Sequence, residues 1–333
     1  MWIALCVLVA PLGWYFWEKM QRKTHPMPGG FRADLTIDHT EEWELYHNDF
    51  SLCSKKARVC MAELGIPYVS HHIDLIETGS YENLSARYLR ANPAGILPLL
   101  VHNGHPIFES HEQILYAANY VKGTNPLIPA GGDERTVMDH WVHKSSLLGD
   151  DPISGMRETA GNAVPGLTLP IFATMINAIP WRQILVGLLF HRAKVRPLMF
   201  MRMKSLGSDK LAQEPRMVGV IRKSREAMHV HLDELETALE SSDGEFIVGS
   251  QFTLADVGMS VILERLAEVD WLDEFLTNRL HVAAYWETVQ ARPSYQKGIA
   301  NHRHPAVVAG FAKVLKLKSE NEKFREALMG SIA

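Results

Sequence analysis

The chain has 333 residues, 47% of them hydrophobic and 22% charged, which is enough for two globular domains of ordinary composition. The formal net charge of -4 gives no reason to expect a nucleic acid as the partner of the whole chain. Three cysteines, Cys6, Cys53 and Cys60, exclude a disulfide framework and favour a reducing compartment. No Cys/His spacing is typical of a zinc site, and His302 and His304 are interpreted as part of a polar loop, so no metal is predicted.

The chain begins with an apolar run. Residues 1–17 carry no charged side chain, and acidic and basic residues follow. This length is close to the minimum for a bilayer span. The sequence therefore predicts a single-pass membrane anchor over 1–23, with the folded domains on the cytosolic side. A signal peptide and a buried helix are the alternatives. Residues 24–42 are rich in proline and glycine and are predicted to be a linker.

Residues 43–123 have the pattern of an α/β domain. Short apolar runs with strand periodicity alternate with segments of helical periodicity. The order is strand, helix, strand, helix, strand, strand, helix, at Glu44–Tyr46, Lys55–Leu64, Tyr68–Ile73, Tyr81–Leu89, Leu97–Val101, Pro106–Phe108 and Ser110–Val121. Asn103 and Gly104 between the last two strands are a strong hairpin signal.

The first helix of this domain starts with Ser51 and Cys53. Free backbone N–H groups and the positive end of the helix dipole meet at such a start, and they stabilise an anionic sulfur. The pattern therefore favours thiol chemistry. The alternative is structural: Ser51 caps the helix and Cys53 is a small buried residue.

Pro98 lies inside an apolar strand pattern, where a proline forfeits a ladder hydrogen bond. A cis peptide bond at the entry of this strand would place backbone groups beside the Ser51 turn. An edge-strand proline is the alternative.

Residues 133–301 are predicted to be helical, after a proline- and glycine-rich connector at 124–132. Thr253 and Asp256 have the spacing of a capping box with a short acid, which assigns them to folding rather than to catalysis. Residues 302–333 are predicted to be a helical tail.

Residues 150–215 make the helical domain longer than a compact domain requires, and they are predicted to be an insertion. Its stretch 168–190 is apolar, and several basic residues follow it. Two interpretations are open: a surface over 168–204 that lies on anionic lipid, or a lid over a substrate cleft.

Together these motifs resemble the glutathione transferase superfamily over roughly residues 43–301. The element order, the Ser-x-Cys-Ser turn, Leu97-Pro98 and Phe108-Glu109-Ser110 resemble its thioredoxin-like N-terminal domain. Phe-Thr-Leu-Ala-Asp-Val at 252–257 resembles a motif of its all-α C-terminal domain. The long insertion resembles the ganglioside-induced differentiation-associated branch.

This resemblance implies a glutathione site. Ser51 would hydrogen-bond the glutathione thiolate. Leu97, beside a cis Pro98, would pair with the peptide backbone of glutathione. Glu109 and Ser110 would hold its γ-glutamyl end, which agrees with the affinity of a helix N-terminus for a carboxylate and of an acid for an ammonium.

The implied activity is that of a homodimeric glutathione S-transferase, a detoxification enzyme that conjugates or reduces a hydrophobic electrophile bound between its domains. A second interpretation rests on the resemblance of the Ser51–Ser54 turn to reductive dehalogenases, in which Cys53 would form a mixed disulfide with glutathione. A third is a membrane-tethered scaffold that keeps the fold without catalysis.

Overall fold

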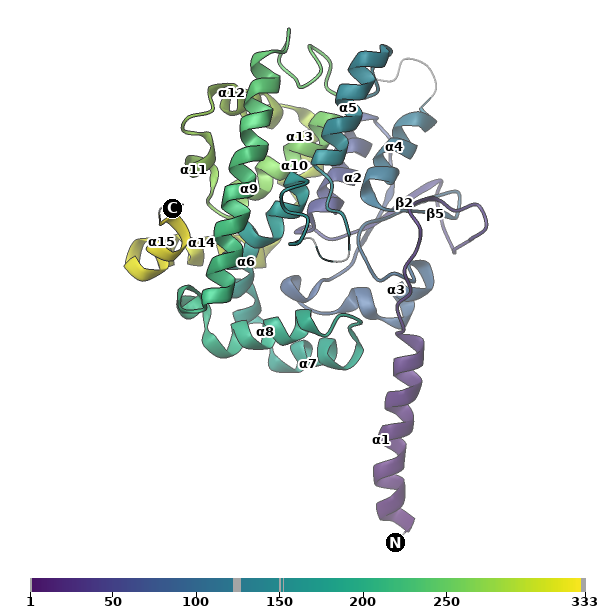
Figure 1. Ribbon diagram of the computed structural model, residues 1–333. Helices are drawn as coiled ribbons and strands as arrows, with labels where there is room; N and C mark the ends of the chain where they lie inside the picture. Colours follow the sequence, from purple (N-terminus) through teal and green to yellow (C-terminus); the bar gives the residue numbers. More distant parts are fainter. Residues whose placement is uncertain (1, 122–126, 150, 152, 331–333) are drawn as a thin grey trace.

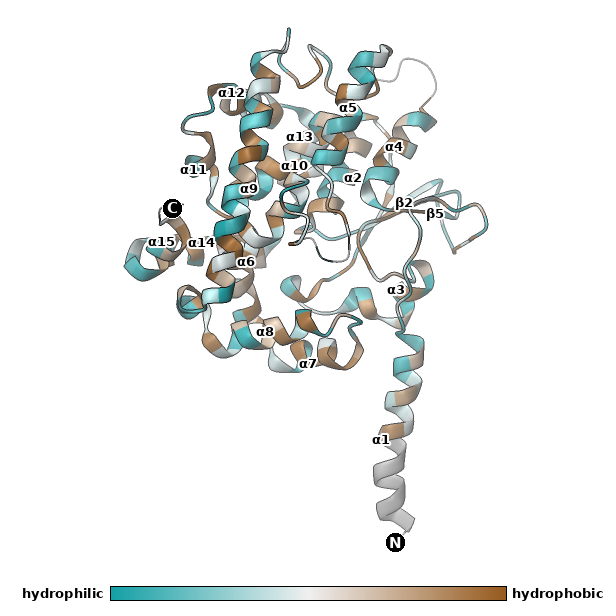
Figure 2. Ribbon diagram, viewed as in Figure 1, coloured by the Kyte–Doolittle hydropathy of each residue, from teal (hydrophilic) through white to brown (hydrophobic). Residues whose placement is uncertain are grey.

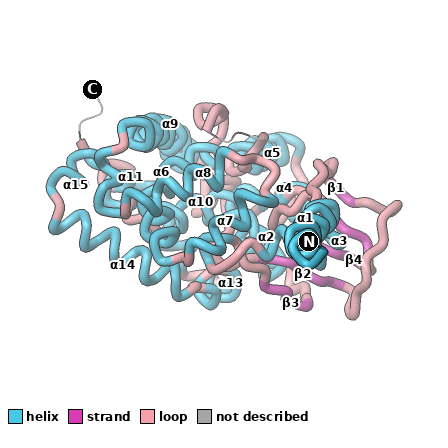
Figure 3. The backbone as a smooth tube through the Cα atoms, turned by 90° about the horizontal axis from the view of Figure 1, so that it is seen from below, coloured by secondary structure: helices cyan, strands magenta, loops and turns pink. Residues whose placement is uncertain are grey.

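The computed structural model describes residues 2–121, 127–149, 151 and 153–330. An α/β domain and a helical domain lie side by side, and the first helix projects away from both (Figure 1). Seen from below, the strands gather on one side of the molecule and most helices on the other (Figure 3). The predicted thioredoxin-like domain followed by an all-α domain is therefore confirmed as the architecture. Part of the predicted connector, residues 124–126, lies outside the described residues.

The α/β domain is built on a five-stranded sheet with the order β1-β5-β4-β2-β3. The strands are β1 (Gly30–Phe31), β2 (Trp43–His47), β3 (Val69–His72), β4 (Leu99–His102) and β5 (His105–Phe108). Strands β2 and β3 are parallel, and the other neighbours are antiparallel. The helices of this domain are α2 (Leu52–Glu63), α3 (Ala86–Ala91) and α4 (Ser110–Tyr120). The predicted helix over Tyr81–Leu89 is divided, because Ser85 caps a new start by accepting a hydrogen bond from the N–H of Tyr88 (3.2 Å).

The segment predicted as a linker, 24–42, adds a strand to the sheet. Strand β1 pairs antiparallel with β5. The pairing continues as single backbone bonds, from the N–H of Arg32 to Pro106 O (3.0 Å) and from the N–H of Ile37 to Gly104 O (2.9 Å). The Phe31 ring also stacks on Tyr116 of α4, with ring centroids 4.9 Å apart. This part of the chain is therefore packed along the β5 edge of the sheet.

The helical domain is organised around the buried helices α6 (Ala160–Ala178) and α10 (Leu254–Glu268), which pack against each other, with α9 (Pro215–Glu240) against α6 and α5 (Gly132–Lys144) against α10. Further helices complete it and form the predicted tail: α11 (Leu272–Leu276), α12 (Leu280–Gln290), α13 (Pro293–Gly298), α14 (Pro305–Glu320) and α15 (Glu322–Met329). Hydrophilic and hydrophobic residues alternate around α9 (Figure 2). Its apolar face, which includes Ile221, Met228 and Leu235, is buried.

The predicted capping box at the start of α10 is present. Asp256 Oδ2 accepts from the backbone N–H of Thr253 (2.7 Å), and Asp256 Oδ1 accepts from the N–H of Ile247 (3.1 Å). Asp256 has no exposed surface, and this burial raises the pKa of its carboxyl to about 6. The box therefore joins the 246–252 loop to the buried central helix.

The insertion consists largely of three helices: α6, α7 (Trp181–Phe190) and α8 (Val195–Leu206). Helix α6 is buried over most of its length and packs against α9 and α14, so residues 168–178 belong to the protein core. Among the described residues of the insertion, the large apolar side chains that are exposed, such as Trp181 and Leu198, lie on α7 and α8. The predicted lipid-facing surface over 168–204 is therefore not supported.

The predicted membrane anchor is wrong. Residues 2–21 form a regular helix, α1 (Trp2–Gln21), but no single helix within the described ranges is both long and apolar enough to cross a bilayer. The pair α6 and α7 reaches that limit only when the two are joined, across a bend of 113°. The predicted single-pass membrane localisation is withdrawn with it.

Candidate functional site

The register of the sheet brings three loops to one end of the domain. Tyr46 of β2 pairs with Leu99 of β4, and Leu100 of β4 pairs with Ile107 of β5. The end of β2, the start of β4 and the end of β5 are therefore neighbours. The loops attached to them carry the residues named from the sequence: Ser51 and Cys53, Leu97 and Pro98, and Glu109 and Ser110.

Ser51 is the N-cap of α2, and its Oγ accepts from the backbone N–H of Ser54 (3.2 Å). The oxygen acts there as an acceptor, so the hydroxyl hydrogen is free to be donated elsewhere. For Ser51 the two interpretations made from the sequence are therefore compatible, because one hydroxyl can cap the helix and donate to an anion in front of it. The structural interpretation of Cys53 as a buried residue is wrong, since Cys53 is partly exposed. Ser51 is partly exposed.

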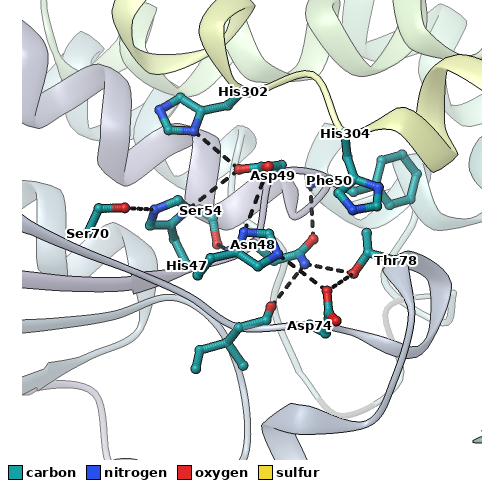
Figure 4. A network of polar contacts seen from close by, with 12 residues as sticks. His47, Asn48, Asp49, Phe50, Ser54, Ser70, Asp74, Thr78, His302 and His304 are labelled. Atoms are coloured by element: carbon teal, nitrogen blue, oxygen red, sulfur yellow. Dashed lines mark hydrogen bonds and ion pairs between the residues drawn. The ribbon is translucent and has the colours of Figure 1, made fainter.

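Asn48 holds the turn that presents Ser51, and sequence reasoning missed it. Its side-chain amide donates to Ile73 O (3.0 Å) and Thr78 Oγ1 (2.9 Å), and its Oδ1 accepts from the N–H of Phe50 (3.0 Å) (Figure 4). Asn48 has no exposed surface. The available signal was a polar residue directly after a buried strand, a position at which side-chain bonds to the backbone are common.

The Leu97–Pro98 peptide bond is cis, as the resemblance implied. Gln113 of α4 ties this turn to the end of β5, because its Nε2 donates to Pro98 O (2.9 Å) and to Ile107 O (2.9 Å). Neither the N–H nor the C=O of Leu97 has a hydrogen-bond partner among the described residues. Both groups are therefore available to an extended peptide ligand. Sequence reasoning did not single out Gln113.

Glu109 and Ser110 form the start of α4. Glu109 has φ 66°, an unusual value for a residue with a side chain, and Ser110 is buried in the first helical turn. Burial, followed by the nearby charge of Glu112, raises the pKa of Glu109. No cation in the described part of the chain pairs with Glu109, and no side chain caps α4. The arrangement suits a ligand with an ammonium and a carboxylate side by side.

Cys53 lies in the first turn of α2, partly exposed and not in a disulfide. One helical turn further along, Lys56 is almost fully buried and its Nζ donates to Ser145 O (3.1 Å). Burial lowers the pKa of Lys56 to about 8, and the neighbouring Cys53 opposes this shift. A lysine so close to the thiol was not identified from the sequence, because helical spacing alone does not tell which charged residues are buried.

Replacing Lys56 with methionine is expected to raise the free energy of unfolding by about 2 kcal/mol at pH 7, because the folded state holds a desolvated charge. The pKa of Lys56 in the folded state is below the ordinary 10.5. The loss of stability caused by its buried charge is therefore fully present below about pH 8 and disappears as the pH rises to 10.5. Urea titrations at pH 7 and 10.5 measure the difference, and the exposed Lys297→Met is the matched control. An equal effect of Lys56→Met on the free energy of unfolding at both pH values would contradict the lowered pKa of Lys56.

A large hollow lies away from these loops. Its volume is about 710 Å³, and it is lined by residues at the start of β2 and the end of α2, including Trp43 and Gly65. The thiol chemistry expected at Ser51 is located at the opposite end of β2. This hollow is therefore not the acceptor pocket predicted between the two domains.

Comparisons with known proteins agree with this geometry. Residues 50–119 match the family model of the glutathione S-transferase N-terminal domain, and residues 222–302 match that of the C-terminal domain. The Arabidopsis thaliana protein named glutathione S-transferase TCHQD is 26% identical over 261 residues, covering 78% of this chain and 90% of the relative. The tetrachloro-p-hydroquinone reductive dehalogenase of Sphingobium chlorophenolicum is 24% identical over 261 residues, covering 77% of this chain and 94% of the relative.

Solved structures support the same fold. Glutathione transferase F7 from Populus trichocarpa has a TM-score of 0.53 at 21% identity and covers 81% of this chain and 99% of its own. The β-etherase LigF from Sphingobium sp. strain SYK-6 has a TM-score of 0.61 at 18% identity and covers 78% of this chain and 98% of its own. The family predicted from the sequence is confirmed, and with it the enzyme class, glutathione transferase, and its co-substrate, glutathione. The chain belongs to the glutathione S-transferase superfamily.

Proposed function

We propose that this protein activates glutathione at the N-terminus of α2 and transfers its sulfur to a hydrophobic electrophile. The observation that carries the proposal is the strand register, by which Ser51, Leu97 and Glu109 are attached to neighbouring strand ends. Ser51 Oγ–H donates to the glutathione sulfur, and the helix dipole adds to the stabilisation of the thiolate. The N–H and C=O of Leu97 pair with the peptide backbone of the ligand.

The start of α4 recognises the γ-glutamyl group through two adjacent residues, Glu109 and Ser110. The Glu109 carboxylate binds the ammonium, and the N-terminal N–H groups at Ser110 bind the carboxylate. The reaction then forms a bond between the thiolate sulfur and the electrophilic carbon. The leaving group departs with the bonding electron pair, and the thiol proton passes to solvent.

The insertion acts as a lid at this end of the domain. Gly187 of α7 is in tight contact with the Tyr81 ring, and Arg196 of α8 lies 3.5 Å from the Glu77 carboxylate. Glu77 and Tyr81 follow β3, which is parallel to β2, so they belong to the same end of the sheet as Ser51. The acceptor site between the domains, the homodimer and the role in detoxification stay predictions.

Glutathione binding tests this proposal. The protein is expected to bind glutathione in isothermal titration calorimetry, and Glu109→Gln is expected to weaken binding by about 10-fold or more, because a charge-assisted hydrogen bond is lost. Glu112→Gln, at a neighbouring glutamate whose side chain is 43% exposed, is the control and should change the affinity less. Absence of binding at millimolar glutathione, or equal effects of both variants, would contradict the site and favour a non-catalytic scaffold.

A second activity is favoured by Cys53, partly exposed beside Ser51, and by two relatives named as a reductive dehalogenase and a reductive dechlorinase. We propose it as the alternative. The thiolate of Cys53 attacks the sulfur of a glutathione conjugate, and a mixed disulfide between Cys53 and glutathione forms. The bond between that sulfur and the substrate carbon breaks, and the carbon keeps the electron pair and takes up a proton. A second glutathione attacks the mixed disulfide, which releases glutathione disulfide and restores the Cys53 thiol. Two glutathione molecules therefore supply the two electrons.

A further inference from the structure

Two buried cations and a carboxylate lie between the two domains, next to the Ser51 turn. Lys55 belongs to α2, and Arg265 and Glu268 belong to α10, which packs against α2 (Figure 1). The side chains of Lys55 and Arg265 are 1% and 5% exposed, and that of Glu268 is 12% exposed. Buried charges are costly even when they are paired, so this group calls for an explanation.

Arg265 reaches the backbone of the turn from the second domain. Its Nη2 donates a hydrogen bond to Phe50 O, and its guanidinium carbon lies 3.8 Å from the centre of the Phe50 ring. Phe50 directly precedes the N-cap Ser51, so its carbonyl lies outside the hydrogen-bond series of the helix. Arg265 therefore supplies a donor that the helical pattern of α2 does not supply.

This contact acts on the peptide group that sets the direction of Ser51. The C=O of Phe50 and the N–H of Ser51 belong to one planar peptide group, and a rotation of this group changes φ of Ser51. Its N–H donates to Asn48 O (3.3 Å), and its C=O accepts from Arg265. With both sides held, Ser51 keeps φ -62°, at which its Oγ caps the helix.

Glu268 orients Arg265 and joins it to Lys55. Glu268 Oε2 lies 2.9 Å from Arg265 Nε, and Glu268 Oε1 accepts from Lys55 Nζ. The backbone N–H of Lys55 in turn donates to Ser51 O (3.0 Å). Helix α10 therefore holds the start of α2 on both sides of Ser51, at Phe50 and at Lys55.

A different contact between the domains lies at the same loop. His302, in the segment between α13 and α14, has its Nδ1 3.2 Å from Asp49 Oδ1 (Figure 4). This contact ties the side chain of Asp49 to the helical domain. Arg265 differs from His302 because it holds the peptide group next to Ser51 itself.

We propose that Arg265 is a positioning residue for the activation of glutathione, which acts through the Phe50 carbonyl on the direction of the Ser51 hydroxyl. The inference rests on the proposed function, because it concerns the same sulfur-binding turn. Arg265 does not contact glutathione in this role. The thiolate site therefore depends on the docking of the helical domain, although the residues that bind glutathione belong to the first domain.

Arg265→Met in the full chain tests this role. Glu268 keeps Lys55 as its partner in this variant, so no carboxylate is left unpaired. The kcat for conjugation of an activated aryl chloride is expected to fall about 10-fold with little change in KM for glutathione, because the reacting group is misplaced rather than lost. The pH midpoint of bound thiolate, followed by its ultraviolet absorbance, should rise by about one unit.

Arg225→Met is the matched control, because the Arg225 side chain is also 5% exposed and has the same kinds of contact. It donates to Glu274 and to Gly330 O (3.0 Å), and its guanidinium lies 5.8 Å from the Trp271 ring. None of these partners belongs to the first domain. The control therefore measures the general effect of losing a buried arginine, and its kcat and thiolate midpoint should equal those of the unchanged protein.

Arg265→Lys is a second variant, and circular dichroism checks that each variant folds. It keeps a cation beside Glu268, but an ammonium lacks the planar fork that reaches Glu268 and Phe50 O together, so kcat and the midpoint should change in the same direction. Unchanged values in the folded Arg265 variants would overturn the inference and leave the group as a structural contact between the domains.

Ser51→Ala separates this result from a failure of the proposed function. A thiolate midpoint that moves in Ser51→Ala but not in the Arg265 variants would reject the positioning role alone. A midpoint that Ser51→Ala does not move would reject the proposed function, and the inference with it.

Discussion

Ser51→Ala is expected to lower the rate of glutathione conjugation by about 10- to 100-fold, measured with an activated aryl chloride. A hydrogen bond to a charged group contributes about 1.5–3 kcal/mol, and here it is made to the thiolate that attacks. The ultraviolet absorbance of bound thiolate should fall in parallel, because the pKa of the bound thiol rises. The affinity for glutathione should change less, since Leu97 and Glu109 hold the rest of the ligand.

Two further variants separate the catalytic role of Ser51 from its role as a helix cap. Ser51→Thr keeps a hydroxyl and a cap and should retain much of the rate. Ser51→Gly removes the hydroxyl but costs only a few tenths of a kcal/mol as a cap, so it should lose activity while remaining nearly as stable. Full activity in both the alanine and the glycine variant would exclude Ser51 as the thiolate donor.

Cys53→Ala distinguishes the two proposed chemistries. For a transferase, the variant should retain conjugation. For the reductive pathway, it should lose turnover of a halogenated substrate while bound thiolate is still detected, and the glutathione conjugate should accumulate. Loss of activity in Cys53→Ala alone would reject the transferase and leave the reductive enzyme.

Asp256→Ala is expected to lower the free energy of unfolding by about 3–5 kcal/mol at pH 7. The change leaves the buried N–H groups of Thr253 and Ile247 without their acceptor, at about 1–3 kcal/mol each, and it also removes the cap of the central helix α10. Urea unfolding followed by circular dichroism measures the effect. Asp243→Ala in the exposed loop before it is the control and should change stability by less than about 0.5 kcal/mol.

The pH dependence of Asp256 checks the same site. Its folded-state pKa of about 6 is above the ordinary 3.8, so its protonated form contributes stability that is fully present below pH 3.8 and is lost as the pH rises through 6. The stability of the unchanged protein relative to Asp256→Asn should therefore fall by up to about 3 kcal/mol between pH 4 and pH 7. A difference that does not vary with pH would contradict the raised pKa.

The sequence was informative where local chemistry decides the structure. The turn at Ser51, the proline at 98 and the Thr253–Asp256 box each depend on a few adjacent residues, and their patterns predicted their geometry. The helices and strands of the first domain followed from periodicity in the same way, apart from the segment that Ser85 interrupts.

Features that depend on distant contacts were not predictable. Strand β1 has two residues and one of them is glycine, so it has no periodic signal and forms only because β5 offers it a partner. The contacts of Phe50 with Arg265 and of Asp49 with His302 are formed by the packing of two domains. The apolar run over residues 1–17 was misinterpreted, because its composition suggested a span, whereas no single described helix is both long and apolar enough to cross a bilayer.

The pairing of β1 with β5 determines where the protein can be shortened. A version that starts at the predicted domain boundary, residue 43, would remove the hydrogen-bond partners of the backbone groups of Pro106, Ile107 and Phe108. It would leave β5 as an exposed, unpaired edge of the sheet. Such an exposed edge pairs readily with strands of other molecules. A truncation that keeps every residue from Gly30 onward keeps this edge of the sheet paired.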